Sequence, residues 1–452
     1  MDAELDPKVL ASLQRDLVGD VMVPSDAGYD DARRSFNAMI DRRPALIVRC
    51  ADASDVSRTI GFAREQDLPL GVRGGGHSVA GYGLVDGGLT IDLSRMRAVD
   101  VDAGSGTAWA DGGCTWRDLD GALFEDGLAL VGGVYGDTGI GGLTLGGGIG
   151  FLMGTQGLTC DNLIGAELVT ASGDVVEVSE DGDAELLWAL RGGGGNFGVV
   201  TRFRFRLSEV APMFGGSLCV SLKDGSVLER YAAVQSAAPD GFIAMAAPGR
   251  LEDGAAAVVL QVAWQGEPAA GDALVRRIVG DAVALEGSLG PKTYLEIQAI
   301  NELLPFTLRH YWKSAFVPEL SPAAIDAVFE STRGCEPGML AGMLIEPLHG
   351  QARRYGPDHA AWAEREARFH VTALGMWEDP ADDERQIGWT RGAAAAVAAT
   401  GTRGTYVNYS SPDETASRAR IAYPPAIYER LVTVKRRLDP DNVFRSNVNI
   451  VP

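Results

Sequence analysis

A histidine follows three consecutive glycines in the segment Arg73-Gly-Gly-Gly-His-Ser78. Glycine lets backbone amides approach an anion closely and adopt positive φ, so this segment is typical of a loop that holds the phosphates of a cofactor. An imidazole is also nucleophilic enough to bond an electrophilic methyl carbon. Glycine loops are common, however, and His77 could equally be a turn residue without a chemical role. The segment alone leaves both interpretations open.

Two further glycine-rich segments occupy residues 136–150 and 191–201. A nicotinamide-binding Rossmann motif needs a preceding apolar strand, a following helix and an acidic residue about 20 positions later. Here the glycine-rich segment is longer than that motif, and glycines in residues 151–157 would interrupt the following helix before it reaches a useful length. We therefore exclude the Rossmann interpretation and expect a wide backbone cradle for a large cofactor.

The elements around these loops alternate between short strands and helices in the first half of the chain. A strand at 68–72 runs directly into the His77 loop, which is where α/β proteins place cofactor phosphates. Helical spacing over 56–66 follows an expected N-cap at Ser54. The run 200–207 alternates strictly between apolar and polar residues, which predicts a strand with one buried face. The remaining expected elements of this half are a strand at 45–50, a hairpin through 167–178 and a helix at 183–190.

The glycine-rich composition of the first half ends at about residue 208. Alternating strands separated by amphipathic helices predict a second α+β domain, a sheet covered on one side by helices. The expected strands are 217–221, 257–263 and 370–374, and the expected helices are 227–237, 323–329, 385–398 and, at the C-terminal end, 425–438.

The bulk composition restricts the classes of function. A chain of 452 residues exceeds what one hydrophobic core usually organises, so two domains are expected. The formal net charge of −21 opposes binding to nucleic acid and to anionic membranes. Five single cysteines do not form a disulfide framework or a zinc site. No signal peptide or stretch of about 18 apolar residues is evident, so the cytoplasm is the expected location.

The histidines other than His77 show no spacing typical of metal ligands, and no metal is expected. They are interpreted as structural or exposed: His310, His349, His359 and His370. Trp312 is expected in packing, with a pocket wall as the alternative.

The three glycine loops and the histidine, taken jointly, resemble the FAD-linked oxidases of the vanillyl-alcohol oxidase and p-cresol methylhydroxylase superfamily, specifically the berberine-bridge-enzyme-like branch. The likeness extends over nearly the whole chain. The motifs that carry it, in the family's order, are Arg73 to Ser78, Thr138-Gly-x-Gly-Gly142, Gly146-Gly-Gly-x-Gly150, Asp161-Asn162, Arg191 to Gly198, Tyr406-Val-Asn-Tyr409 and Asp439 to Ile450.

This resemblance implies a two-domain α+β fold of the PCMH type. An FAD-binding domain (residues 1–207 plus 415–452) would enclose an inserted α+β substrate domain (208–414), an antiparallel sheet covered by helices. His77 matches the position that bonds the flavin 8α carbon. The resemblance further assigns to the cofactor site Arg73, Gly74, Gly75, Gly76, Ser78, Gly81, Thr138, Gly139, Gly141, Gly142, Gly146, Gly147, Gly148, Asp161, Asn162, Val199, Val200, Asn447 and Asn449.

One position departs from the family pattern. Many members hold the flavin a second time, through a cysteine four residues before the first glycine of Gly-x-Gly-Gly; in this chain that position is Tyr135. A phenol cannot form the thioether, and Cys114 and Cys160 lie in other segments. A single covalent link, through His77, is expected.

The implied reaction removes a hydride from a C–H bond next to oxygen or nitrogen of a small alcohol, sugar or amine. In many relatives a tyrosine matching Tyr409 accepts the accompanying proton. A phenol with a pKa of about 10 does so near neutral pH only if cations stabilise the phenolate. Tyr406, Tyr311 and Lys313 are the other candidates, and a structural role is the alternative for each.

The hydroxynicotine oxidase branch has asparagine where this chain has Tyr409, which argues against a direct transfer of its amine substrate. Dioxygen is the expected acceptor of the electrons. A dehydrogenase with another acceptor and a catalytically silent flavin-binding protein stay as alternatives.

Overall fold

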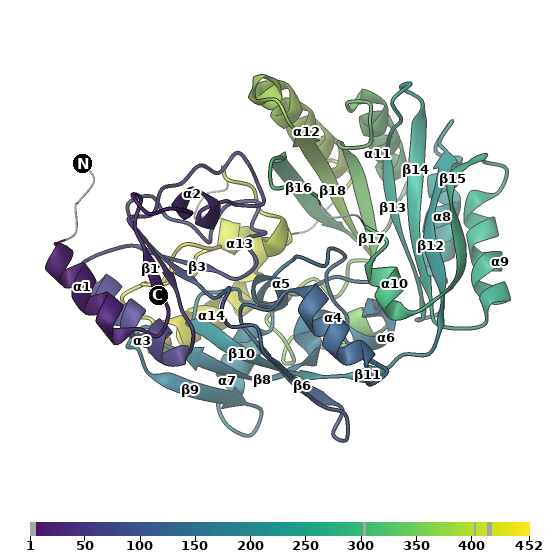
Figure 1. The fold of residues 1–452 in the computed structure, drawn as a ribbon. Helices are drawn as coiled ribbons and strands as arrows, with labels where there is room; N and C mark the ends of the chain where they lie inside the picture. The colour runs from purple at the N-terminus through teal and green to yellow at the C-terminus, as the bar shows by residue number, and fades with distance from the viewer. Residues whose placement is uncertain (1–5, 302–303, 402–403, 414–417) are drawn as a thin grey trace.

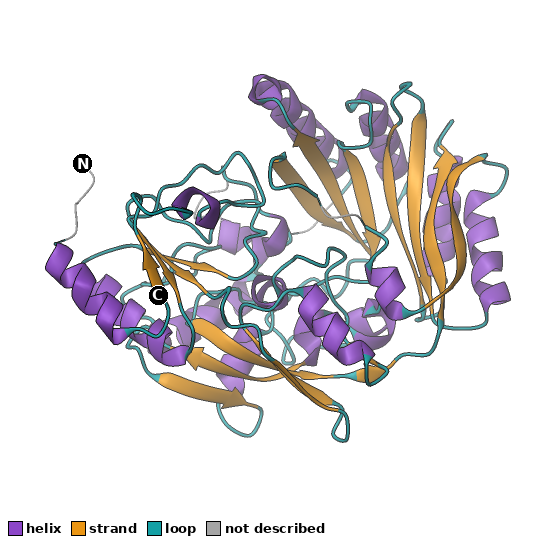
Figure 2. Ribbon diagram, viewed as in Figure 1, coloured by secondary structure: helices purple, strands orange, loops and turns teal. Residues whose placement is uncertain are grey.

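The computed structural model describes residues 6–301, 304–401, 404–413 and 418–452. A four-stranded and a five-stranded sheet and the helices from both ends of the chain form one part of the molecule, and a seven-stranded sheet with its helices forms the other (Figure 1). A short two-stranded sheet pairs β7 (Leu128–Ala129) with β11 (Ser208–Glu209). Figure 2 shows that the strands of the larger sheet stand together beside the first part, with their long helices on the outside.

The first small sheet has the strand order β1-β2-β4-β3. Strands β2, β4 and β3 run parallel, and β1 is antiparallel to β2. Helix α3 (Ala53–Glu65) connects β2 to β3; its N-cap is Asp52, whose side chain accepts from the backbone N–H of Asp55, rather than the expected Ser54. The strands are β1 (Asp20–Met22), β2 (Leu46–Arg49), β3 (Leu70–Arg73) and β4 (Leu89–Asp92).

The second sheet is antiparallel, with the order β5-β6-β10-β8-β9. Its central strand β10 buries Phe203 and Phe205 on the core side, as the period-two pattern predicts. The strands are β5 (Val99–Asp102), β6 (Thr107–Asp111), β8 (Leu163–Val169), β9 (Val175–Ser179) and β10 (Val199–Arg206). The helices of this part are α1 (Pro7–Asp16), α2 (Tyr29–Ala32), α4 (Trp116–Phe124), α5 (Ile140–Gly146), α6 (Met153–Gln156) and α7 (Ala184–Leu190).

Helix α5 lies inside the second glycine segment, where no helix is expected from the sequence. Its glycines are tolerated because the helix is buried, so packing outweighs their poor helix propensity. Gly147, at φ +132°, then ends the helix.

The seven-stranded sheet is antiparallel throughout, in the order β15-β12-β14-β13-β17-β18-β16. Helices α8, α9, α11 and α12 cover one face, and the other face turns towards the first part (Figure 1). The strands are β12 (Met213–Ser221), β13 (Phe242–Arg250), β14 (Ala256–Trp264), β15 (Ala284–Lys292), β16 (Arg309–Val317), β17 (Gly342–Pro347) and β18 (Phe369–Trp377). The helices are α8 (Ser226–Ser236), α9 (Pro268–Val279), α10 (Tyr294–Gln298), α11 (Pro322–Gly334) and α12 (Asp383–Ala398).

The two parts are joined by polar contacts from α10. The Tyr294 hydroxyl donates to the carbonyl of Leu130, and the Gln298 amide donates to the carbonyl of Gly133 and to the buried carboxyl group of Asp120. After the large sheet the chain returns through α13 (Arg418–Ala422) and α14 (Pro425–Leu438) to pack beside α7. Within the described residues, no helix is long and apolar enough to cross a bilayer.

Candidate active site

The His77 loop and the second glycine segment contact each other through their backbones. A Cβ added to Gly75 would overlap the backbone of Gly139, and a Cβ on Gly139 would overlap the backbone of Gly75. Gly76 follows at φ +74°, a region that side-chain-bearing residues rarely adopt. Glycine is therefore required where these two loops cross.

The same loop carries unpaired backbone donors. Among the described residues, nothing accepts a hydrogen bond from the N–H groups of residues 75–78. Residues 75–78 are half-buried, and a row of free backbone donors in a cavity wall is a ready site for an oxygen-rich, anionic group. The Arg73 guanidinium supports the loop from behind by donating to the carbonyls of Ala32 and Arg34, at 2.6 Å each.

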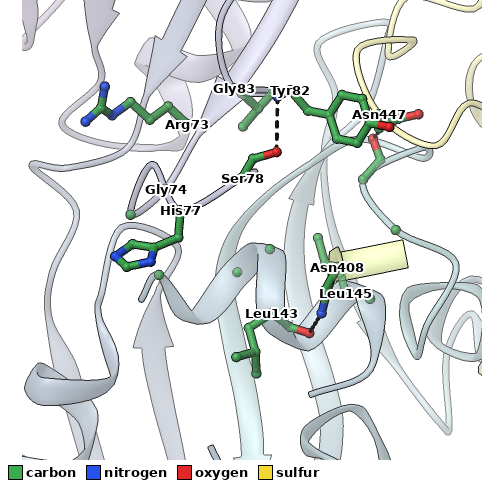
Figure 3. Close-up of a pocket in the computed structure, with 18 of the residues that line it drawn as sticks. Arg73, Gly74, His77, Ser78, Tyr82, Gly83, Leu143, Leu145, Asn408 and Asn447 are labelled. Atoms are coloured by element: carbon green, nitrogen blue, oxygen red, sulfur yellow. Dashed lines mark hydrogen bonds between the residues drawn. The ribbon is translucent and has the colours of Figure 1, made fainter. Parts of the chain in front are cut away.

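These loops line a cavity of about 330 Å³, a size typical of small-molecule and cofactor sites. Figure 3 shows Arg73, His77 and Ser78 on one wall, and Asn408 on another, where its amide donates to the carbonyl of Leu143 at 3.0 Å. The sequence-predicted residues that line the cavity are Arg73, Gly74, Gly75, Gly76, His77, Ser78, Gly81, Thr138, Gly139, Gly141, Gly142, Gly146, Val199, Val200, Tyr406, Tyr409 and Asn447.

The His77 imidazole is largely buried and fixed on several sides. Its ring stacks on Phe36, with the ring centres 4.5 Å apart. Nε2 lies 3.2 Å from Oδ1 of Asp137, and Nδ1 lies 3.4 Å from the hydroxyl of Thr138. The one histidine singled out for chemistry thus forms part of the cavity wall with its ring orientation set by neighbours.

A chain of polar side chains lies at the side of the cavity formed by the large sheet. The Tyr409 hydroxyl donates to Oε1 of Glu346 at 3.2 Å, and Oε2 of Glu346 lies 2.7 Å from Nδ1 of His370. Glu346 and His370 are buried on β17 and β18. Tyr406 lies beside them, where its hydroxyl accepts from the Gly148 N–H at 2.8 Å and from the Asn408 amide at 3.0 Å.

The environment of Tyr409 opposes formation of a phenolate. Burial and the neighbouring Glu346 carboxyl group both raise its pKa well above 10. Burial likewise raises the pKa of Tyr406. Tyr409 therefore has an acidic partner in place of the cation that a phenolate base requires, and Glu346 joins Tyr409 as a candidate acceptor of the proton.

Tyr311 and Lys313 lie on the other face of strand β16, away from the cavity. Side chains alternate along a strand, and Trp312 between them lines the cavity and contacts Tyr409 edge-on, at 5.3 Å between ring centres. The Tyr311 hydroxyl donates to Asp413 at 2.7 Å, and the Lys313 ammonium lies 3.2 Å from the same carboxylate. Neither Tyr311 nor Lys313 belongs to the cavity lining.

Several residues matched by motif lie outside the cavity lining and contact other parts of the protein. Asp161 is buried and accepts from the Arg365 guanidinium at 2.6 Å and 2.8 Å, and the Asn162 amide donates to backbone carbonyls of residues 156 and 158. A Cβ on Gly148 would overlap Thr159. The matched residues outside the cavity lining are Gly147, Gly148, Asp161, Asn162 and Asn449.

Two site residues are missed from the sequence, Glu346 and His370. A lone glutamate between apolar residues in Leu344-Ile-Glu-Pro347 is the available signal, because β17 otherwise buries apolar side chains. His370 carries no such signal, since only the strand pairing of β17 with β18 places it opposite Glu346.

Tyr135 lines the cavity, and burial raises its pKa to about 12. Cys114 and Cys160 are buried and do not belong to the cavity lining. Burial also raises the pKa of both thiols.

Comparison with known proteins agrees with this geometry. Residues 44–179 match the model of the FAD binding domain family, and residues 405–451 match that of the berberine and berberine-like family. The chain is 32% identical to (R)-6-hydroxynicotine oxidase of Paenarthrobacter nicotinovorans over 96% of its own length and 97% of that protein. An FAD-linked oxidoreductase of Dictyostelium discoideum is 28% identical, covering 95% of this chain and 93% of the relative.

The fold is shared with solved structures. 6-Hydroxy-D-nicotine oxidase from Arthrobacter nicotinovorans superposes with a TM-score of 0.87 at 30% identity, covering 96% of this chain and 98% of that one. Glucooligosaccharide oxidase from Acremonium strictum, whose FAD is described as 6-S-cysteinyl and 8α-N1-histidyl, gives 0.86 at 24% identity, covering 98% and 99%.

Fold and site together define an FAD-dependent oxidoreductase with the two-domain α+β architecture of the PCMH type. The chain belongs to the berberine-bridge-enzyme-like family of FAD-linked oxidases.

Proposed function

We propose that this protein is an oxidase that carries its FAD on a single covalent bond to His77 and oxidises a C–H bond next to oxygen or nitrogen in a small alcohol, sugar or amine. The observation that carries the proposal is the cavity itself. One wall offers free backbone donors and the His77 ring, and another offers the Tyr409–Glu346–His370 chain. The residues proposed as cofactor anchor and as proton acceptor thus border the same space.

The residues fit an FAD in its polar and covalent requirements. The free N–H groups of 75–78 would bind pyrophosphate oxygens, and Val199 and Val200 would form part of the wall at the adenine end. Asn447 lies on the wall contributed by the C-terminal segment. With Tyr135 in the cavity wall and both nearby cysteines outside it, the chain supports one covalent link rather than two.

When bound, the flavin supplies the acceptor for a hydride. The protein must supply an acceptor for the proton of the substrate O–H or N–H. Tyr409 keeps its own proton at neutral pH, so its hydroxyl positions the Glu346 carboxylate, which lines the cavity and accepts the proton of the substrate. His370 holds Glu346 in place from the opposite oxygen.

The test is anaerobic reduction of the bound flavin across a panel of alcohols, sugars and amines, followed by admission of air. We expect at least one class to bleach the flavin absorbance and air to restore it with production of hydrogen peroxide. Bleaching that air does not reverse would identify a dehydrogenase with another acceptor. A flavin that no compound in the panel reduces would contradict the proposed catalysis.

A further inference from the structure

The imidazole of His77 is held in one orientation by aromatic rings. Phe36 stacks on one face, tilted by 20° at 4.5 Å between ring centres, and Phe306 meets the ring edge-on at 5.3 Å. On its other side Phe36 stacks on the buried His310 at 4.2 Å, which fixes Phe36 itself. The direction in which each ring nitrogen of His77 points is therefore set before any ligand binds.

One of those nitrogens has a carboxylate beside it. Nε2 of His77 and Oδ1 of Asp137 are 3.2 Å apart, both atoms are shielded from solvent, and neither hydrogen-bonds to any other described residue. The contact has the distance of an ion pair without the alignment of a hydrogen bond. In ligand-free sites such contacts are commonly poorly aligned and tighten on binding. Asp137 does not belong to the cavity lining.

We propose that Asp137 is a positioning residue for covalent flavin attachment: it accepts the Nε2–H of His77 and leaves the Nδ1 lone pair as the nucleophile. The hydrogen bond made by one ring nitrogen decides which nitrogen carries the proton. Thr138 fits the same tautomer, because its hydroxyl, 3.4 Å from Nδ1, can donate to a lone pair there. The inference rests on the proposed tether, since a histidine that never bonds flavin needs no selected tautomer.

Charge supports the same role. Partial burial works against ionisation of Asp137, but its contact with His77, a backbone hydrogen bond and the charge of Arg117 together lower the pKa of the carboxyl group, so it is an anion at neutral pH. When Nδ1 bonds carbon, positive charge develops on the ring, and an adjacent anion stabilises it. A neutral residue in the place of Asp137 lacks this stabilisation.

Covalent attachment oxidises the flavin 8α-methyl carbon by two electrons. Nδ1 forms a bond to the 8α-methyl carbon while one C–H bond of that methyl group breaks and its proton leaves to solvent. The Nε2 proton passes to Asp137 and from there to solvent. The electron pair left by the C–H bond reduces the flavin by two electrons. Dioxygen then takes up these two electrons and two protons as hydrogen peroxide, which returns the attached flavin to its oxidised form.

The experiment compares full-length wild type with D137N, D137L and H77A, and with D126N as a control at an exposed carboxylate. Each protein is prepared without flavin from riboflavin-starved cells and mixed with FAD in air. Covalent attachment is followed by flavin fluorescence of the acid-precipitated protein, and non-covalent binding by visible absorbance. Neither measurement depends on turnover of a substrate.

We expect D137L to bind FAD but attach it about 10²-fold more slowly, in the range that loss of a proton-accepting group produces. D137N, whose amide oxygen still accepts from Nε2, should be intermediate, and D126N should equal wild type. Attachment by D137L at the wild-type rate would overturn the role of Asp137. Failure of both Asp137 variants to bind FAD at all would overturn it too, because the carboxylate would then serve the loop's fold. A wild type without covalent flavin would instead overturn the tether.

Discussion

The two walls of the cavity are built in different ways. The wall formed by residues 73–81 and 138–146 presents backbone, and its composition is extreme because only glycine allows the loops to cross. The wall formed by the large sheet and residues 406–410 presents side chains on ordinary strands, selected by register. A site built from backbone groups can be predicted from glycine content in the sequence. A site built from side chains depends on which strands pair, and this pairing cannot be predicted from composition.

The largest effect is expected at the anchor. Replacing His77 with alanine should abolish covalent flavin completely, because the backbone donors of the cradle cannot form a bond to carbon. FAD should still be bound reversibly, and acid precipitation should release all of it. Flavin that stays with the protein after denaturation would show that another residue carries the bond.

The next largest effect is expected at Glu346, on the cavity wall formed by the large sheet. Glu346→Gln keeps a polar side chain between Tyr409 and His370 but removes the acceptor of the proton. We expect the rate of flavin reduction by substrate to fall by about 10² or more, the usual contribution of a general base. Stopped-flow absorbance measures this directly. Unchanged reduction with covalent FAD still in place would contradict the assignment.

A smaller change in the rate of flavin reduction is expected from substitutions that compare the two faces of the large sheet. Tyr409→Phe removes one hydrogen bond that positions the reacting groups. It should slow flavin reduction by about tenfold, which is equivalent to about 1.4 kcal/mol. Tyr311→Phe is the matched control, since it removes the same atom on the helix-covered face. We expect it to leave the reduction rate within about twofold of wild type. Equal effects of the two substitutions would show that the register argument is wrong.

The smallest effect concerns stability and pH. Burial of Asp413 works against ionisation, but hydrogen bonds from Tyr311 and Arg391 and the charge of Lys313 lower its pKa to about 2. A carboxyl group with a lowered folded-state pKa stabilises the fold above its unfolded pKa of about 3.9, and this contribution is lost as the pH falls towards 2. Since Asp413 is partly exposed, Asp413→Asn should cost only about 0.5–1 kcal/mol at pH 7. Denaturant unfolding at pH 7 and pH 3 should show the difference shrinking at the lower pH.

The sequence predicts the cradle well because its constraints are local. The positive φ at Gly76 and the backbone contact of Gly75 with Gly139 are reflected directly in residue type. The family pattern also places Tyr409 on the cavity wall. The helix at residues 140–146 is missed because tertiary burial outweighs the propensity of its glycines.

The sequence predicts the sheet wall poorly because side-chain direction depends on register. Lys313 and Trp312 are neighbours in sequence and point to opposite faces, and a shift by one residue would exchange them. His370 meets Glu346 only through the pairing of β18 with β17. Such long-range pairings leave no mark on local composition.

The C-terminal segment that closes the cavity has a consequence for biosynthesis. Ser446 donates to the carbonyl of Tyr82, which precedes it by 364 positions, and Phe444, Ser446 and Asn447 complete the cavity wall. At about 5–20 residues per second, the ribosome needs roughly 20 to 70 seconds to synthesise the stretch between them, which includes the entire large sheet. During that time the glycine loops lack their closing wall. On the proposed tether, covalent attachment of flavin therefore follows synthesis of residues 444–447, because the cavity lacks this wall before then.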